Sequence, residues 1–110
     1  MNQERRLFSK VQNKEIDKKE DKYREYTKIF KAFCDEKRLE IIGKLKNGEK
    51  CACILIDEIG IAQSALSYHM KILCDSEIIQ SRQEGKWTYY SINNENINKA
   101  SEILKTITEI

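Results

Sequence analysis

Residues 51–73, CACILIDEIGIAQSALSYHMKIL, decide the fold of this chain. Apolar residues recur at helical spacing on both sides of Gly60, so we predict one short helix over residues 51–59 and a second over residues 62–75. Only Gly60 and Ile61 separate the two helices. A glycine turn this tight is typical of a helix-turn-helix, whose second helix can enter the major groove of DNA.

Two further helices are predicted before this stretch. Apolar residues at helical spacing predict the first over residues 23–34. Asp35 is expected to cap the second, and Asn47 and Gly48 supply its left-handed stop. The inner face of this second helix is expected to consist of Leu39, Ile42 and Leu45.

After Glu77 the apolar period changes from helical to alternating, which predicts strands over residues 79–83 and 86–92. Glu84 and Gly85 between them predict a hairpin turn, so the hairpin would form a wing. A last amphipathic helix carries the apolar residues Ile97, Ala100, Ile103, Leu104, Ile107 and Ile110. This face is wider than a small domain needs, which predicts a homodimer formed through the terminal helices.

The 110 residues are enough for one domain with one modest core, and a charged content of 35% without proline favours helices. We therefore predict a mainly α fold with a small β-hairpin, a homodimeric winged helix-turn-helix over residues 21–110. Residues 1–20 form a charged arm, either helical or disordered. No apolar run there suits a signal peptide or membrane span, so we expect a cytoplasmic protein without a membrane partner. A net charge of +2 does not by itself indicate nucleic-acid binding.

The predicted helix over residues 62–75 has two contrasting sides. Leu66, Met70 and Leu73 share one side, which should face the core, with Ala62 and His69 flanking them. The opposite side collects the polar or amphipathic residues Gln63, Ser64, Ser67, Tyr68 and Lys71. These types can bond base edges and phosphates of double-stranded DNA, although each alone could be an ordinary surface residue.

His69, Arg82 and Lys86 have alternative interpretations. His69 is the only histidine, and its place beside the apolar side favours a hydrogen-bonded packing residue over a metal ligand. Arg82 and Lys86 stand on either side of the predicted wing turn, where phosphate or minor-groove contact is expected. The alternative for the latter two is an ordinary charged hairpin tip.

Cys51 and Cys53 open the first helix of the helix-turn-helix, where the helix dipole and free amides lower thiol pKa values. Residues two apart on a helix point about 200° away from each other, so we expect an ion to reach both sulfurs only if the first turn frays. Such fraying would move the following helix. The alternative is a pair of partly buried small residues. Cys34 is expected in the core and Cys74 on the exposed side of its helix, and either could add a third thiolate.

Three stretches make the sequence resemble the ArsR/SmtB family of winged-helix metalloregulators from about residue 26 to residue 92. They are FCDEKRLEII at 33–42, the helix-turn-helix stretch, and RQEGKWTYYSI at 82–92. The resemblance implies a homodimeric repressor that leaves its operator when a metal or metalloid binds. It places the CxC arsenic motif on Cys51 and Cys53 and the DNA contacts on Gln63, Ser64, Ser67 and His69.

The sequence also departs from the family pattern. Ile56 stands where arsenic-responsive members often add a third cysteine, and Glu36 replaces the usual proline. Residues 1–33 lack the cysteines that cadmium and lead sensors carry. The last helix offers Glu102 and Glu109 but no histidine, unlike the zinc sensors.

Soft trivalent arsenic or antimony suits neighbouring thiolates, so As(III) or Sb(III) is the expected inducer. Cys51 and Cys53 would bind it, with a third thiolate from Cys34, Cys74 or an exogenous thiol. One alternative is a repressor that senses oxidation or persulfidation through the same thiols. Another is a thiol oxidoreductase, which lacks support because CxxC spacing and alternating strands and helices are absent. We therefore predict no enzyme activity, and a metal-blind regulator is the remaining alternative.

Overall fold

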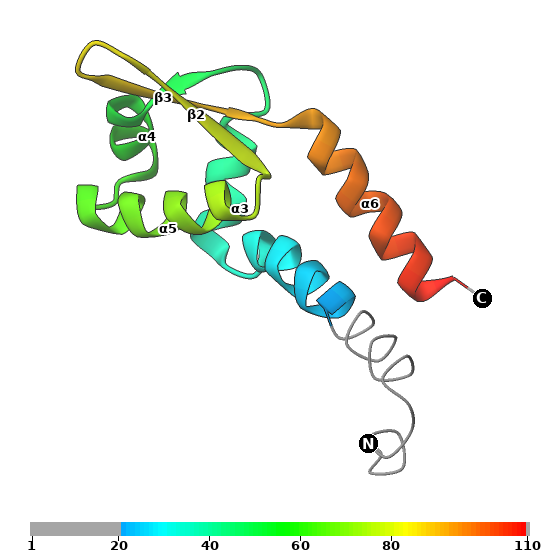
Figure 1. Cartoon of the computed structure of the whole chain (residues 1–110). Coiled ribbons are helices and arrows are strands. Elements are labelled where there is room, and N and C mark those ends of the chain that lie inside the picture. Colours follow the sequence, from blue (N-terminus) through cyan, green and yellow to red (C-terminus); the bar gives the residue numbers. More distant parts are fainter. Residues whose placement is uncertain (1–20, 110) are drawn as a thin grey trace.

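The computed structural model describes residues 21–109, so the predicted arm over residues 1–20 and the apolar Ile110 lie outside the described residues. Residues 21–30 are helical and lead into a single 3₁₀ turn. The elements that follow (Figure 1) are η1 Lys31–Phe33, α3 Glu36–Lys44, β1 Lys50–Cys51, α4 Ala52–Ile59, α5 Gln63–Asp75, β2 Ile79–Glu84, β3 Trp87–Ile92 and α6 Asn94–Thr108. The pair α4–α5, followed by the β2–β3 hairpin and a last helix, confirms the predicted winged helix-turn-helix.

Helix α3 begins where the sequence predicts. Asp35 caps it, because its carboxylate accepts hydrogen bonds from the backbone N–H groups of Lys37 at 2.7 Å and Arg38 at 3.2 Å. Partial burial alone would raise the pKa of Asp35, but the N–H groups of Arg38 and Lys37, together with the charges of His69 and Arg38, bring it below its ordinary value. The cap therefore depends on an ionised carboxylate.

The predicted inner face of α3 is partly wrong. Leu39 is 51% exposed, whereas Arg38, Ile41 and Leu45 are buried. Arg38 and Ile41 are three residues apart, and Ile41 and Leu45 are four apart, so these side chains share one side of the helix. Ile42 packs partly buried against the same core. The helix also ends at Lys44, before the predicted stop.

The helix-turn-helix has its predicted glycine. Gly60 adopts a φ of 76° and donates its N–H to the carbonyl of Ile56, closing α4. Helix α4 begins at Ala52 and α5 at Gln63, each one residue later than predicted. Ala62 is consequently the N-cap residue of α5 and is exposed, so it does not flank the core.

The wing consists of strands β2 and β3 in antiparallel register, joined by Gly85 and Lys86 rather than by Glu84 and Gly85. Gly85 has a φ of 62°, which favours glycine in this tight turn. A third strand, β1, was not predicted and gives the sheet the order β1-β3-β2. It has only two residues, too few for an alternating pattern to be recognised.

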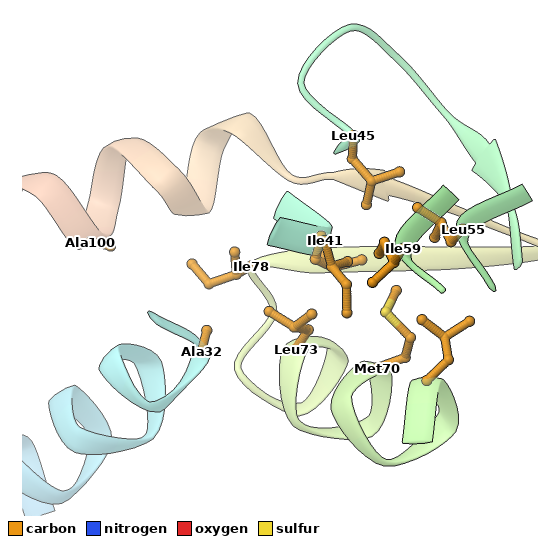
Figure 2. Packing of buried hydrophobic residues seen from close by; sticks show 11 residues of the cluster. Ala32, Ile41, Leu45, Leu55, Ile59, Met70, Leu73, Ile78 and Ala100 are labelled. Atoms are coloured by element: carbon orange, nitrogen blue, oxygen red, sulfur yellow. The ribbon is translucent and has the colours of Figure 1, made fainter. Parts of the chain in front are cut away.

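The core lies between α3, α4, α5 and the sheet (Figure 2). The side chains at its centre that are almost completely buried are Ile41, Leu45, Leu55, Leu73, Ile78 and Ile79. Leu66, Met70 and Leu73 of α5 are all buried, as their spacing predicts. Helix α5 is thus fixed to the core by one side, which leaves its other side exposed.

The terminal helices leave the winged-helix body on the same side (Figure 1). Ala100 of α6 is buried, whereas Leu104, Ile107 and Tyr23 are exposed. The apolar width that the sequence predicts for the last helix is therefore present on the surface of the described chain. Within residues 21–109, none of the helices combines the length and the apolar character that crossing a bilayer requires.

Candidate functional site

The outer side of α5 carries the side chains that the sequence predicts to contact DNA. All five are exposed: Gln63, Ser64, Ser67, Tyr68 and Lys71. The ammonium group of Lys71 lies 3.1 Å from the carboxylate of Asp75, one turn further along the helix. Because an exposed pair of this kind contributes at most about 1 kcal/mol, a phosphate can replace Asp75 as the partner of Lys71.

His69 lies on the buried side of the same helix and is 9% exposed. Its Nδ1 atom is 3.1 Å from Nη1 of Arg38, and Nε of Arg38 donates to the carbonyl of Lys31 at 3.2 Å. The prediction of a hydrogen-bonded packing residue is confirmed. A base contact by His69, which the resemblance implies, is not compatible with this buried position.

Cys51 and Cys53 lie at the junction between β1 and α4. Cys51 is the N-cap residue of α4, with an extended backbone, and Cys53 is in the first helical turn. Their sulfurs are 2.9 Å apart, which contradicts the prediction that the first turn must fray before both can reach one ion. The 200° separation applies only when both residues are helical, and Cys51 precedes the helix.

The two thiols differ in exposure and acidity. Cys51 is 6% exposed, whereas Cys53 is exposed. The pKa of Cys51 is lowered by the hydrogen bond from the Cys53 thiol and by the backbone N–H groups of Cys53 and Ile54. The same bond to Cys51, together with partial burial, raises the pKa of Cys53. Cys51 is therefore the first of the pair to become a thiolate.

The other two cysteines occupy the reverse of their predicted positions. Cys34 is exposed, with its Sγ 3.3 Å from the carbonyl of Phe30, because it follows the 3₁₀ turn rather than ending a helix against the core. Cys74 packs against the core, and burial, followed by the charge of Asp75, raises its pKa. Among residues 21–109 no three histidine, cysteine or acidic side chains come together to hold a metal ion. The structure therefore does not bring Cys34 or Cys74 to the thiol pair.

The wing residues have partners within the chain. Arg82 forms hydrogen bonds of 2.7 and 2.8 Å with the two carboxylate oxygens of Glu49 and one of 3.0 Å with Glu84. Lys86 lies in the turn, with its ammonium group 5.5 Å from the ring centroid of Trp87. The sequence does not predict this partner, because Glu49 is 33 positions away from Arg82 and only the pairing of β1 with β3 brings the two together.

Several known proteins resemble this chain in sequence. The family described as "Bacterial regulatory protein, arsR family" matches residues 35–81. The arsenical resistance operon repressor of Bacillus subtilis (strain 168) is 43% identical over 81 residues, which cover 73% of this chain and 77% of the relative. The arsenical resistance operon repressor of Staphylococcus xylosus is 39% identical over 87 residues, covering 76% of this chain and 84% of the relative.

Similarity to solved structures extends over most of the molecule. The crystal structure of NolR from Sinorhizobium fredii has a TM-score of 0.67 and 26% identity, covering 83% of this chain and 91% of the other. The helix-turn-helix, the wing and these matches show that the chain is a winged helix-turn-helix transcriptional regulator that belongs to the arsR family of bacterial regulatory proteins.

Proposed function

We propose that this regulator is a homodimeric repressor that releases its operator when Cys51 and Cys53 bind As(III) or Sb(III). The observation that carries the proposal is the 2.9 Å distance between the two sulfurs, one helix before α5. Soft metalloids favour thiolate ligands, so this donor pair suits them better than it suits a hard cation. The arsenical resistance repressors among the relatives support the same class of inducer.

DNA binding is assigned to the exposed side of α5 and to the wing. Gln63 can form a bidentate pair with adenine, and Ser64 and Ser67 can bond base edges or phosphates. Tyr68, which is exposed on the same side, offers a hydroxyl. Lys86 in the wing turn is proposed to bind a phosphate.

The homodimer is assigned to the terminal helices. Leu104 and Ile107 of α6 and Tyr23 of the helix over residues 21–30 expose apolar side chains. These two helices leave the winged-helix body on the same side (Figure 1). Burying such a face against a second copy removes it from water and places two copies of α5 on one duplex. Sedimentation of the protein before and after Leu104→Lys tests this assignment, because a charge there should favour the monomer.

The donor atoms fit a soft ion in number and chemistry. Cys51 is the more acidic thiol, and Cys53, the exposed one, gives the ion access from solvent. A bound metalloid would supply a bridge between the two sulfurs. Since residues 21–109 bring no third ligand of these types to the pair, a small exogenous thiol is the proposed third donor.

Titration of the reduced protein with arsenite, antimonite, cadmium and zinc tests the inducer, with operator release and free thiols measured together. We expect arsenite and antimonite to remove two thiols per protomer and to release the DNA. The double variant Cys51→Ser with Cys53→Ser should bind DNA and ignore arsenite. Cys34→Ser with Cys74→Ser is the matched control and should respond like the parent. Release by cadmium or zinc alone would contradict the proposed inducer.

The same distance favours one second candidate, a thiol redox switch. Two sulfurs this close can form a disulfide, losing two protons and two electrons to an oxidant such as a peroxide. Operator release by peroxide or polysulfide, without release by arsenite under strictly reducing conditions, would support this candidate. The relatives are transcriptional regulators, which argues against the thiol oxidoreductase alternative.

A further inference from the structure

The thiol pair and the wing arginine lie in one row across the sheet. Cys51 of β1 pairs with Tyr89 of β3, and Tyr89 pairs with Arg82 of β2 on its other side. Directly paired residues of antiparallel strands extend their side chains from the same face. Consistent with this, the guanidinium of Arg82 lies 4.6 Å from the ring centroid of Tyr89. Only one aromatic side chain therefore separates the inducer site from Arg82.

Arg82 is held in place by Glu49, the residue that directly precedes β1. Its Nε and Nη2 atoms donate to the two carboxylate oxygens of Glu49, a two-bond geometry that a phosphate would also use. A guanidinium paired in this way cannot present the same two groups to DNA. Because Arg82 is about half exposed and Glu49 about one-third exposed, exchange between the carboxylate and a phosphate needs little desolvation.

Glu49 is in turn joined to the thiol site by the shortest strand of the sheet. It directly precedes β1, which is attached to β3 by only two residue pairs. Cys51 ends β1 and Cys53 lies in the first turn of α4, so a ligand held by both sulfurs would fix the backbone conformation where β1 continues into α4. Figure 1 shows β1 meeting the hairpin beside α4. A strand attached to its neighbour by only two residue pairs can shift, and a ligand bound at the end of the strand opposes that shift.

We propose that Glu49 is a positioning residue that couples the thiol site to the wing. In the unloaded repressor on its operator, β1 shifts and Glu49 gives up Arg82 to a DNA phosphate. A metalloid bound to Cys51 and Cys53 holds β1 in the arrangement seen here, so Arg82 stays paired with Glu49 and does not bind the phosphate. This inference rests on the proposed function and adds the route by which the bound ion lowers DNA affinity.

The test compares operator affinity with and without arsenite for the parent, Glu49→Gln and Glu84→Gln, at several salt concentrations. For the parent we expect a loss of affinity of about 5- to 150-fold, the usual range for coupled sites. For Glu49→Gln, the loss of operator affinity caused by arsenite should be at least about fivefold smaller than in the parent. Two thiols per protomer should still be consumed. Glu84→Gln is the matched control, because it also removes a partner of Arg82 but lies outside β1, and its loss should equal that of the parent.

The salt dependence provides a readout that a general change in stability would not move. In the parent, arsenite binding should make the negative slope of log affinity against log salt shallower by about 0.9 for each phosphate that Arg82 releases. The slope of Glu49→Gln should be the same with and without arsenite. A parent that binds no arsenite or keeps its operator overturns the proposed function. A responsive parent with an equally responsive Glu49→Gln, or with the same slope in both states, overturns only the coupling through Glu49.

Discussion

His69 should stabilise the recognition helix rather than read DNA, and His69→Ala tests this assignment. The imidazole is buried, and its Nδ1 lies 3.1 Å from Nη1 of Arg38, which is itself 6% exposed. Alanine leaves that N–H of the guanidinium without a partner, which costs about 1–3 kcal/mol, and also removes a buried ring. We therefore expect the free energy of unfolding to fall by about 2 kcal/mol, within the ordinary range for such losses.

Urea unfolding at one fixed protein concentration measures this loss, because association would otherwise shift the midpoint. With a slope of roughly 1.5 kcal/mol per molar urea, a loss of ~2 kcal/mol lowers the midpoint by roughly 1.3 M. His69→Asn is the matched control, since its side-chain oxygen can accept from Arg38 near the position of Nδ1 and should recover about 1 kcal/mol. A parental midpoint for His69→Ala, or relaxed base preference at full stability, would refute the packing role.

The remaining predictions concern the cap, the base contacts and the thiol pair. Asp35→Ala should lower the free energy of unfolding by about 1 kcal/mol at neutral pH. In the folded protein the pKa of Asp35 lies below its ordinary value of 3.8. The difference in urea midpoint between the parent and Asp35→Ala should therefore vanish as the pH falls through the folded pKa. Gln63→Ala should cost about 1–3 kcal/mol of discrimination at one base pair, measured by binding to operators changed one position at a time, with unfolding unaltered. Cys53→Ala should raise the pKa of Cys51, seen as alkylation of Cys51 that begins at higher pH, whereas Cys53→Ser should preserve most of the hydrogen bond.

Local patterns in the sequence specify the helix-turn-helix of α4 and α5, which is why the sequence predicts these two helices closely. Gly60 and the apolar spacing of Leu66, Met70 and Leu73 are local signals, and each has the predicted role. The rotation of α3 is harder to predict, because Leu39 fits the apolar period but is exposed, whereas the charged Arg38 is buried and bonded to Lys31 and His69. A hydrophobic period indicates that one face is buried, and small errors of phase change which residue lies there.

The site was harder to predict than the fold, because its geometry depends on pairing between distant segments. Strand β1 exists only because Lys50 and Cys51 pair with β3, and no local pattern of two residues reports this. The same pairing brings Glu49 to Arg82, so an arginine predicted to contact phosphate or the minor groove is paired with a carboxylate here. The candidate residues could thus be named from the sequence, whereas their distances and partners could not.

Because the two sulfurs already lie close together, the proposed effect of a bound metalloid on operator affinity cannot come from unwinding α4. If bringing the sulfurs of Cys51 and Cys53 together required α4 to unwind, a bound ion would displace α5 through α4 alone. With the sulfurs already 2.9 Å apart and α4 intact from Ala52 onward, the ligand has nothing to unwind. A ligand shifts an equilibrium only by its difference in affinity between two states, and about 5.5 kcal/mol is needed to change a 99:1 population into a 1:99 one. If a metalloid at these sulfurs releases the operator as proposed, the operator-bound form must hold the two sulfurs less favourably than this structure does. Strand β1, attached by two residue pairs, is then the element whose displacement would separate them.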